Sequence, residues 1–170
     1  LTQVASDKGV LMIIKNYSGD MMNFQNGAAL ATDDGIQVDY VKVADDIAVE
    51  DSLYTVGRRG VAGTVFVHKI AGAAAAQGYE LARVKEIAQK AADNVTSLGF
   101  AFSSCTVPAK GTPTFTLADD EMEYGVGIHG EPGIRREKIL PSQQLAQRII
   151  DDLLKDRPQL SEVAVLINGF

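Results

Sequence analysis

Short apolar runs alternate with helical patterns along the chain, and this alternation predicts its secondary structure. Continuous apolar runs are typical of buried strands, whereas apolar residues that recur every three or four positions are typical of helices. The predicted strands cover Val10–Ile14, Ile36–Val43, Gly99–Val107, Tyr124–Ile128 and Val163–Ile167. The predicted helices cover Met21–Ala31, Thr64–Ala76 and Leu81–Val95, and a fourth begins near Pro141. Strands that alternate with helices predict an α/β protein with mixed sheets flanked by helices.

Breaks in this pattern divide the chain into two lobes. Pro108, Gly111 and Pro113 interrupt regular structure, so we expect part of a first α/β lobe over residues 1–107 and the start of a second over residues 108–170. Both ends of the chain lie within apparent secondary structure, where a natural domain more often has a polar tail. We therefore expect a fragment that spans parts of two lobes of a larger subunit.

The composition narrows the class of protein. Of the 170 residues, 46% are hydrophobic and 22% are charged, and the net charge is −6. An acidic surface argues against non-specific binding to nucleic acid or to an anionic membrane. Cys105 is the sole cysteine, so no intrachain disulfide can form, and no apolar run is long enough to span a bilayer. We expect a cytoplasmic protein without nucleic-acid or membrane partners.

The two histidines differ in their surroundings. His68 lies among apolar residues of a predicted helix, where we expect an ordinary helical side chain. His129 lies among glycines at the end of a predicted strand, where α/β folds place ligands and where the backbone allows a close approach. A ligand-binding role and a loop histidine without function fit these residues equally well. Cys105 paired with His129 as a nucleophile is a further alternative.

Two charged residues follow the first predicted strand. Asp20 begins the next predicted helix, where an aspartate acts either as an N-cap or, held ionised by the helix dipole and by nearby Lys15, as a general base. Lys15 ends a buried strand, so its ammonium group needs a partner or a ligand. Both residues are candidates for a site at this strand end.

Motifs for other chemistries are incomplete. The glycines of Gly125–Gly130 have the spacing of a dinucleotide-binding loop, but Glu131 and Pro132 follow where a helix should begin. The chain has no Gly-x-x-x-x-Gly-Lys-Ser/Thr loop, and two histidines with one cysteine are too scattered for a zinc site. Gly57–Gly60 is a candidate phosphate-binding loop, and Arg135–Lys138 is predicted to be a solvated loop.

Four segments, taken in order and spacing, resemble the substrate-binding K subunit of dihydroxyacetone kinase over essentially the whole chain. They are Gly9–Asp20, Gly57–Gly60, Ser104–Pro108 and Gly127–Gly133. The resemblance implies that His129 binds dihydroxyacetone covalently as a hemiaminal. It also implies that Lys15 and Asp20 contact the substrate, with Asp20 near the hydroxyl that is phosphorylated. His129 and Asp20 are thus the implied catalytic residues, and no metal site is implied.

The same resemblance implies a phosphotransferase that depends on a partner. Magnesium with ADP or ATP is expected on a separate L subunit, rephosphorylated by the phosphotransferase system, or on a fused domain, and this chain binds no cofactor itself. A homodimer is expected. The family's second active-site histidine, in a loop ending Gly-His-Glu-Pro, is not among these residues. Paralogues that bind dihydroxyacetone as non-catalytic coactivators of transcription are the alternative, although the presence of both Lys15 and Asp20 favours the enzyme.

Overall fold

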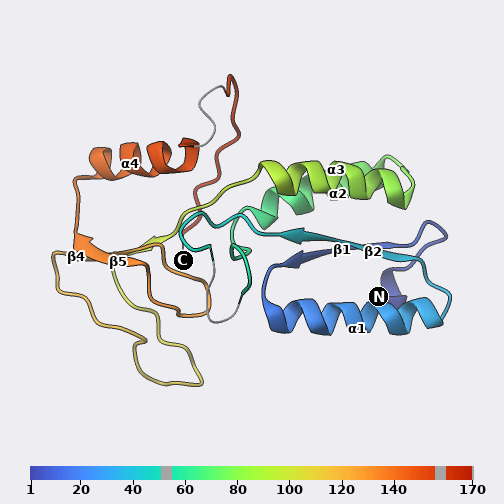
Figure 1. Cartoon of the computed structure of the whole chain (residues 1–170), viewed down its shortest axis with the longest axis horizontal. Coiled ribbons are helices and arrows are strands. Elements are labelled where there is room, and N and C mark those ends of the chain that lie inside the picture. The colour runs from blue at the N-terminus through green and yellow to red at the C-terminus, as the bar shows by residue number, and fades with distance from the viewer. Residues whose placement is uncertain (51–54, 156–159, 170) are drawn as a thin grey trace. The chain divides into compact units, whose positions relative to one another are not determined.

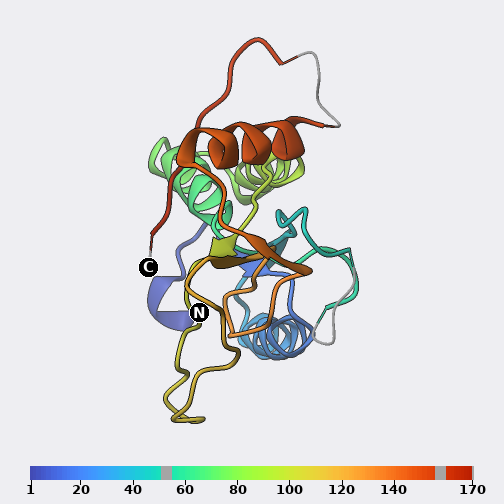
Figure 2. The ribbon, with the colours of Figure 1, turned by 90° about the vertical axis from the view of Figure 1, so that its left-hand side faces the viewer.

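The computed structural model describes residues 1–50, 55–155 and 160–169, and Figures 1 and 2 show the chain from two directions. It consists of two units, Leu1–Asp45 with Glu50–Val95 and Asp46–Val49 with Thr96–Phe170. Helices and small sheets in both units confirm the α/β class. No helix in the described part of the chain is long and apolar enough to cross a membrane.

A parallel pair of strands forms the centre of the first unit. After a short 3₁₀ helix (Thr2–Val4), β1 (Val10–Lys15) pairs with β2 (Val38–Val43), and the last pair joins Lys15 to Val43. Parallel strands need a crossover connection, and α1 (Ser18–Asp33) supplies it on one face of the sheet (Figure 1). The carboxyl ends of both strands therefore meet at one edge.

Two further helices cover the opposite face of this sheet, as Figure 2 also shows. α2 (Thr64–Ala76) and α3 (Leu81–Asn94) match the predicted helices to within one residue. The small side chains of α2 allow close packing, and the shared core consists of valines and alanines. Its buried members are Val41, Val43, Val67, Ala71, Ala74, Val84 and Ala88. Burial of this apolar surface stabilises the unit by about 25 cal/mol per Å² removed from water.

The second unit is built on a three-stranded antiparallel sheet. Its order is β3 (Phe100–Ala101), β4 (Glu121–Tyr124) and β5 (Arg135–Lys138). The last helix, α4 (Ser142–Leu154), begins directly after Pro141, as predicted. Its apolar stripe contributes to a small core whose buried members are Met122, Tyr124 and Leu145. The first unit ends at Val95, earlier than the lobe boundary predicted at residue 107, because β3 pairs with β4 of the second unit.

The predicted strands of this second unit need correction. The strand expected over residues 99–107 is reduced to β3, and the one expected over 124–128 ends at Tyr124, where Gly125 takes a positive φ of 80°. Residues 135–138, predicted to be a solvated loop, form β5 because Arg136 pairs with the buried carboxylate of Glu123 on β4 at 3.3 Å. Charge alone therefore did not decide between loop and strand.

The strand predicted for residues 163–167 is also absent from the described structure. No strand of the described ranges pairs with this segment, and the side chains of Val165 and Ile167 are exposed. A strand requires a hydrogen-bonding neighbour as well as an apolar pattern. The apolar run alone was therefore insufficient evidence.

Candidate functional site

The turn between β1 and α1 places both charged candidates at the carboxyl edge of the first sheet. The N–H of Asn16 donates to the carbonyl of Val43 at 2.9 Å, and α1 begins two residues later, at Ser18. Asp20 is therefore the third residue of the helix, and Tyr17 occupies the N-cap position. The N-cap interpretation of Asp20 is wrong, because the helix begins before it. Its carboxylate lies in the first turn, where the helix dipole favours negative charge.

The ammonium group of Lys15 is available to a ligand. The side chain is partly buried at the end of β1. Among the residues that the structure describes, none forms a hydrogen bond or an ion pair with its Nζ atom. A partly buried charge gains free energy when it meets an oxygen atom that replaces water. Lys15 thus remains the stronger of the two candidates on geometric grounds.

A loop over residues 55–63 crosses the end of β1 beside Lys15. At Gly60 a Cβ atom would lie 2.7 Å from the Cα of Lys15 and 2.8 Å from the backbone nitrogen of Asn16, so only glycine fits. The side-chain amide of Asn16 holds the loop by donating to the carbonyls of Val56 at 3.0 Å and Arg58 at 2.8 Å. The loop therefore fixes the backbone from which Lys15 projects.

Asp45 anchors the far end of the same loop. Its buried carboxylate accepts hydrogen bonds from the backbone N–H groups of Val61 at 2.7 Å and Gly63 at 2.8 Å, directly before α2. Arg59, part of the predicted phosphate-binding segment, is only 1% exposed and so does not present its guanidinium group to solvent. Sequence reasoning missed Asn16 and Asp45, although both polar residues follow directly or closely after a strand end.

In the second unit, His129 lies in the glycine-rich loop between β4 and β5. Gly125 and Gly130 have positive φ values of 80° and 82°, which few other residues adopt. A Cβ atom on Gly133 would lie 2.3 Å from the carbonyl oxygen of Tyr124, so the loop closes tightly on the sheet. The imidazole of His129 is 55% exposed. The loop thus presents this ring to solvent from a constrained backbone.

In the described part of the chain, Glu131 is a charged partner of His129, and sequence reasoning did not single it out. Its Oε2 accepts a hydrogen bond from the backbone N–H of His129 at 2.7 Å, while its Oε1 lies 3.5 Å from the Nδ1 of the imidazole. The Glu131 side chain is only 10% exposed. An acidic residue two positions after a candidate histidine was the available signal.

A second loop packs against the one that carries His129. The hydroxyl of Ser104 closes it by accepting the N–H groups of Thr114 at 2.9 Å and Phe115 at 3.1 Å. A Cβ atom on Gly130 would lie 2.9 Å from the methyl group of Thr114 and 3.7 Å from the sulfur of Cys105. Two loops distant in sequence therefore support each other next to His129. Pairing of Cys105 with His129 as a nucleophile stays an untested alternative.

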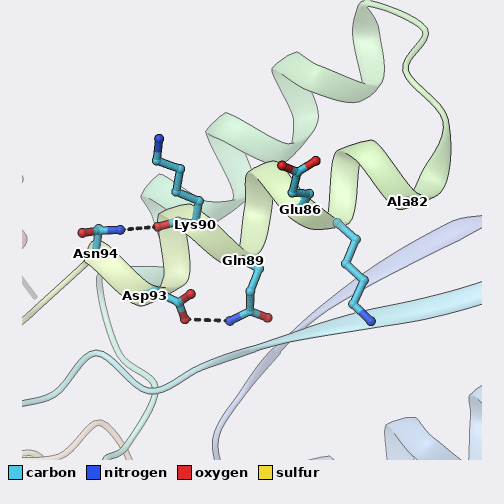
Figure 3. A pocket seen from close by; sticks show the side chains of 7 residues that line it. Ala82, Glu86, Gln89, Lys90, Asp93 and Asn94 are labelled. Carbon is cyan, nitrogen blue, oxygen red and sulfur yellow. Dashed lines mark hydrogen bonds between the residues drawn. The ribbon is translucent and has the colours of Figure 1, made fainter.

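A surface hollow on α3, between Ala82 and Asn94, contains none of the candidate residues (Figure 3). All of its lining side chains come from one helix, and several of them already form hydrogen bonds with other residues of the protein. Gln89 donates to Asp93 at 2.8 Å, and Asn94 donates to the carbonyl of Lys90 at 2.8 Å. A hollow along a single polar helix face is a poor site for a small ligand.

Within the described ranges, no cluster of three or more His, Cys, Asp or Glu residues suits a metal ion.

The fold and its two loops define an α/β protein with polar candidates at a strand edge in one unit and a histidine on a glycine-rich loop in the other. The chain belongs to the Dak1 domain family, whose match covers residues 1–170. This confirms the family that the sequence resembles.

Named relatives support the same family. The chain is 54% identical to the dihydroxyacetone-binding subunit DhaK of the PTS-dependent dihydroxyacetone kinase 1 of Listeria innocua, over 95% of this chain and 50% of that protein. It is 41% identical to the crystal structure of the dihydroxyacetone kinase of C. freundii, with a TM-score of 0.83 over 94% of this chain and 29% of that chain. The chain thus spans about half the length, or less, of these relatives.

A structural neighbour with another role is nearly as similar in fold. The dihydroxyacetone kinase operon co-activator Dha-DhaQ is 37% identical, with a TM-score of 0.82 over 91% of this chain and 47% of that chain. Fold similarity therefore does not separate a kinase subunit from a co-activator.

Proposed function

We propose that this chain forms the substrate-binding part of a dihydroxyacetone kinase, in which His129 holds dihydroxyacetone as a covalent hemiaminal for phosphorylation to dihydroxyacetone phosphate. The observation that carries the proposal is the 55% exposed imidazole of His129 on a backbone fixed by glycines. The 54% identity to a dihydroxyacetone-binding subunit supports this choice of ligand.

The chemistry of imidazole suits a ketone substrate. A neutral ring nitrogen is a nucleophile, and its addition to a carbonyl carbon gives a tetrahedral hemiaminal. Glycerol has nearly the same size but no carbonyl group, so it cannot form this bond. Covalent attachment therefore distinguishes dihydroxyacetone from glycerol, which the shape of a pocket alone would distinguish poorly. It also fixes the terminal hydroxyl before phosphoryl transfer, which contributes through orientation.

Lys15 and Asp20 complete the proposed chemistry. In this proposal Asp20 accepts the proton of the hydroxyl that is phosphorylated, and Lys15 orients the substrate. Support comes from the first unit: Asp20 is not occupied as an N-cap, and the described residues offer the Lys15 ammonium group no partner. Both groups are therefore available to a ligand.

The phosphoryl donor belongs to a partner in this proposal. Magnesium with ADP or ATP is carried by a separate L subunit or a fused domain, and the name of the Listeria relative favours the phosphotransferase system as the source of phosphate. We further propose that the chain acts as a cytoplasmic homodimer. A co-activator that binds dihydroxyacetone without turnover is the second candidate, which the likeness to Dha-DhaQ favours. Catalysis that depends on Asp20 would distinguish the two.

The direct test is to detect the bond between His129 and the ligand. We would incubate the intact protein, labelled with ¹⁵N-histidine, with [2-¹³C]dihydroxyacetone and measure one-bond ¹³C–¹⁵N coupling. We expect coupling in the wild type, none in His129→Gln, and an unchanged signal in the matched control His68→Gln. Glycerol should bind without any such signal. Coupling that persists in His129→Gln, or bound ligand without coupling in the wild type, contradicts the proposal.

A further inference from the structure

One carboxylate oxygen beside His129 is buried without a hydrogen bond. The Oε2 atom of Glu131 accepts the backbone N–H of His129, but its Oε1 atom has no hydrogen-bond partner and lies 3.5 Å from Nδ1 of the ring. Leaving a buried acceptor unsatisfied costs about 1–3 kcal/mol, and more for a charged group. An arrangement of this cost indicates that a donor meets the oxygen in the functional state. The nearby donor of suitable type is the Nδ1–H group of His129.

We propose that Glu131 is a positioning residue for His129: its Oε1 accepts a hydrogen bond from Nδ1–H, which keeps the reactive lone pair on Nε2. This inference rests on the proposed function of His129. A hydrogen bond to one ring nitrogen determines which tautomer a histidine adopts. The 3.5 Å separation is longer than a hydrogen bond, and such contacts commonly shorten when the substrate binds.

The side chains of His129 and Glu131 differ in exposure, which is consistent with different roles. The ring of His129 is 55% exposed, whereas the Glu131 side chain is 10% exposed. The ring can therefore meet a ligand while the carboxylate stays behind it. Glu131 acts through His129 and does not touch the substrate. The hydrogen bond from the backbone of His129 to Oε2 fixes the carboxylate and so leaves Oε1 directed at Nδ1.

The addition step shows why a carboxylate is useful at this position. The Nε2 lone pair forms a bond to the carbonyl carbon of dihydroxyacetone, and the electron pair of the C=O π bond moves to oxygen. The ring then carries a positive charge, which the carboxylate of Glu131 stabilises. Loss of the Nδ1 proton and protonation of the alkoxide give the neutral hemiaminal, so no proton is gained or lost overall. Breakdown of the hemiaminal retraces these steps.

The sharpest variant is Glu131→Gln, because it changes the tautomer while it keeps the shape. Its carbonyl oxygen must still accept the backbone N–H of His129, so its NH₂ group then faces Nδ1 and donates to it. The proton must move to Nε2, which removes the nucleophilic lone pair. The analogous Asp→Asn change in a serine-protease triad costs roughly 10⁴-fold in turnover. Here we expect the affinity for dihydroxyacetone to fall at least about tenfold, the lower end for lost second-shell partners of histidine.

The readout is the ¹⁵N spectrum of His129 in the intact, ligand-free protein at a pH where the ring is neutral, together with ¹³C–¹⁵N coupling to labelled dihydroxyacetone. We expect Nδ1–H in the wild type, Nε2–H with little coupling in Glu131→Gln, and wild-type behaviour in the matched control Glu121→Gln. An Nε2–H tautomer in the wild type overturns the proposal without any variant. Wild-type tautomer and coupling in Glu131→Gln also overturn it. If the wild type shows no coupling at His129, the proposed function itself fails.

Discussion

Asp20 does not cap a helix, so a substitution at this position can test its proposed role in catalysis with little effect on the fold. It lies in the first turn of α1, where Tyr17 holds the N-cap position. We expect Asp20→Asn in the intact protein to retain dihydroxyacetone binding but to lose roughly 10²–10⁴-fold in turnover, as for a lost general base. Steady-state kinetics of the complete kinase, with adduct formation measured in parallel, test this.

The matched control for that variant is Asp33→Asn, the same change at the exposed last residue of α1. It should leave both turnover and binding unchanged. A thermal unfolding midpoint within a few degrees of the wild type would show that each variant is folded. Near-normal turnover in folded Asp20→Asn would remove Asp20 from the proposed chemistry, whereas binding without turnover in the wild type would favour the co-activator.

For single residues, the sequence revealed the candidate side chains but not the groups that hold them. Lys15, Asp20 and His129 were visible because a strand end and a glycine-rich segment are recognisable without a fold. Glu131 and Asn16 have only weak signals in the sequence, because each acts through backbone hydrogen bonds that depend on how a loop folds. Their residue types are ordinary at those positions. Only the three-dimensional loop gives them a role.

At the scale of elements, Tyr124 joins β4 to α4. Its hydroxyl donates to the carboxylate of Asp152, and the guanidinium groups of Arg135 and Arg148 lie 4.3 Å and 4.8 Å from its ring. Burial, and then the hydrogen bond to Asp152, raise the pKa of the Tyr124 hydroxyl above its ordinary value of about 10. The neutral hydroxyl is therefore favoured in the folded state.

We expect Tyr124→Phe to lower the free energy of unfolding by about 1.5–3 kcal/mol at neutral pH, as for a hydrogen bond to a charged group. The raised pKa means that this stabilisation is complete below about pH 10, the unfolded-state pKa. Above it the unfolded tyrosine ionises first, so the difference between wild type and variant should shrink as the pH rises. Urea unfolding between pH 7 and 11 measures this.

The same change at the exposed Tyr79 provides the control. Tyr79→Phe should alter the free energy of unfolding by no more than about 0.5 kcal/mol, as for most surface substitutions. A Tyr124→Phe variant as stable as the wild type at every pH would show that the contact with Asp152 contributes nothing to the packing of α4 on the sheet.

Helices were more predictable from the sequence than strands, for a physical reason. α2 and α3 satisfy their backbone hydrogen bonds internally, so a local apolar period was enough to find both. A strand depends on partners that the local sequence does not reveal. Residues 163–167 have the apolar pattern without a partner in the described structure, whereas β5 is highly charged and pairs with β4. Cross-strand ion pairing replaced apolar burial in β5.

At the scale of the whole molecule, the candidate residues are divided between the two units. Lys15 and Asp20 belong to the first unit and His129 with Glu131 to the second. The proposed function assigns the covalent anchor to the second unit and the proton acceptor to the first.

In the proposed function, this chain binds the substrate and a partner supplies the phosphoryl donor. Phosphoryl transfer requires a nucleotide and magnesium held in line with the acceptor hydroxyl. The sequence has no Gly-x-x-x-x-Gly-Lys-Ser/Thr loop, the described residues contain no cluster of three or more His, Cys, Asp or Glu that suits a metal ion, and the net charge of −6 does not attract a polyanion. We therefore expect the intact protein with magnesium-ATP and dihydroxyacetone to be inactive alone and active once a nucleotide-bearing partner is added.

The assay measures dihydroxyacetone phosphate with and without that partner, with His129→Gln as the control that should abolish the signal. Turnover without a partner that scales with the concentration of this protein, and that His129→Gln abolishes, would place the nucleotide site on the intact protein itself.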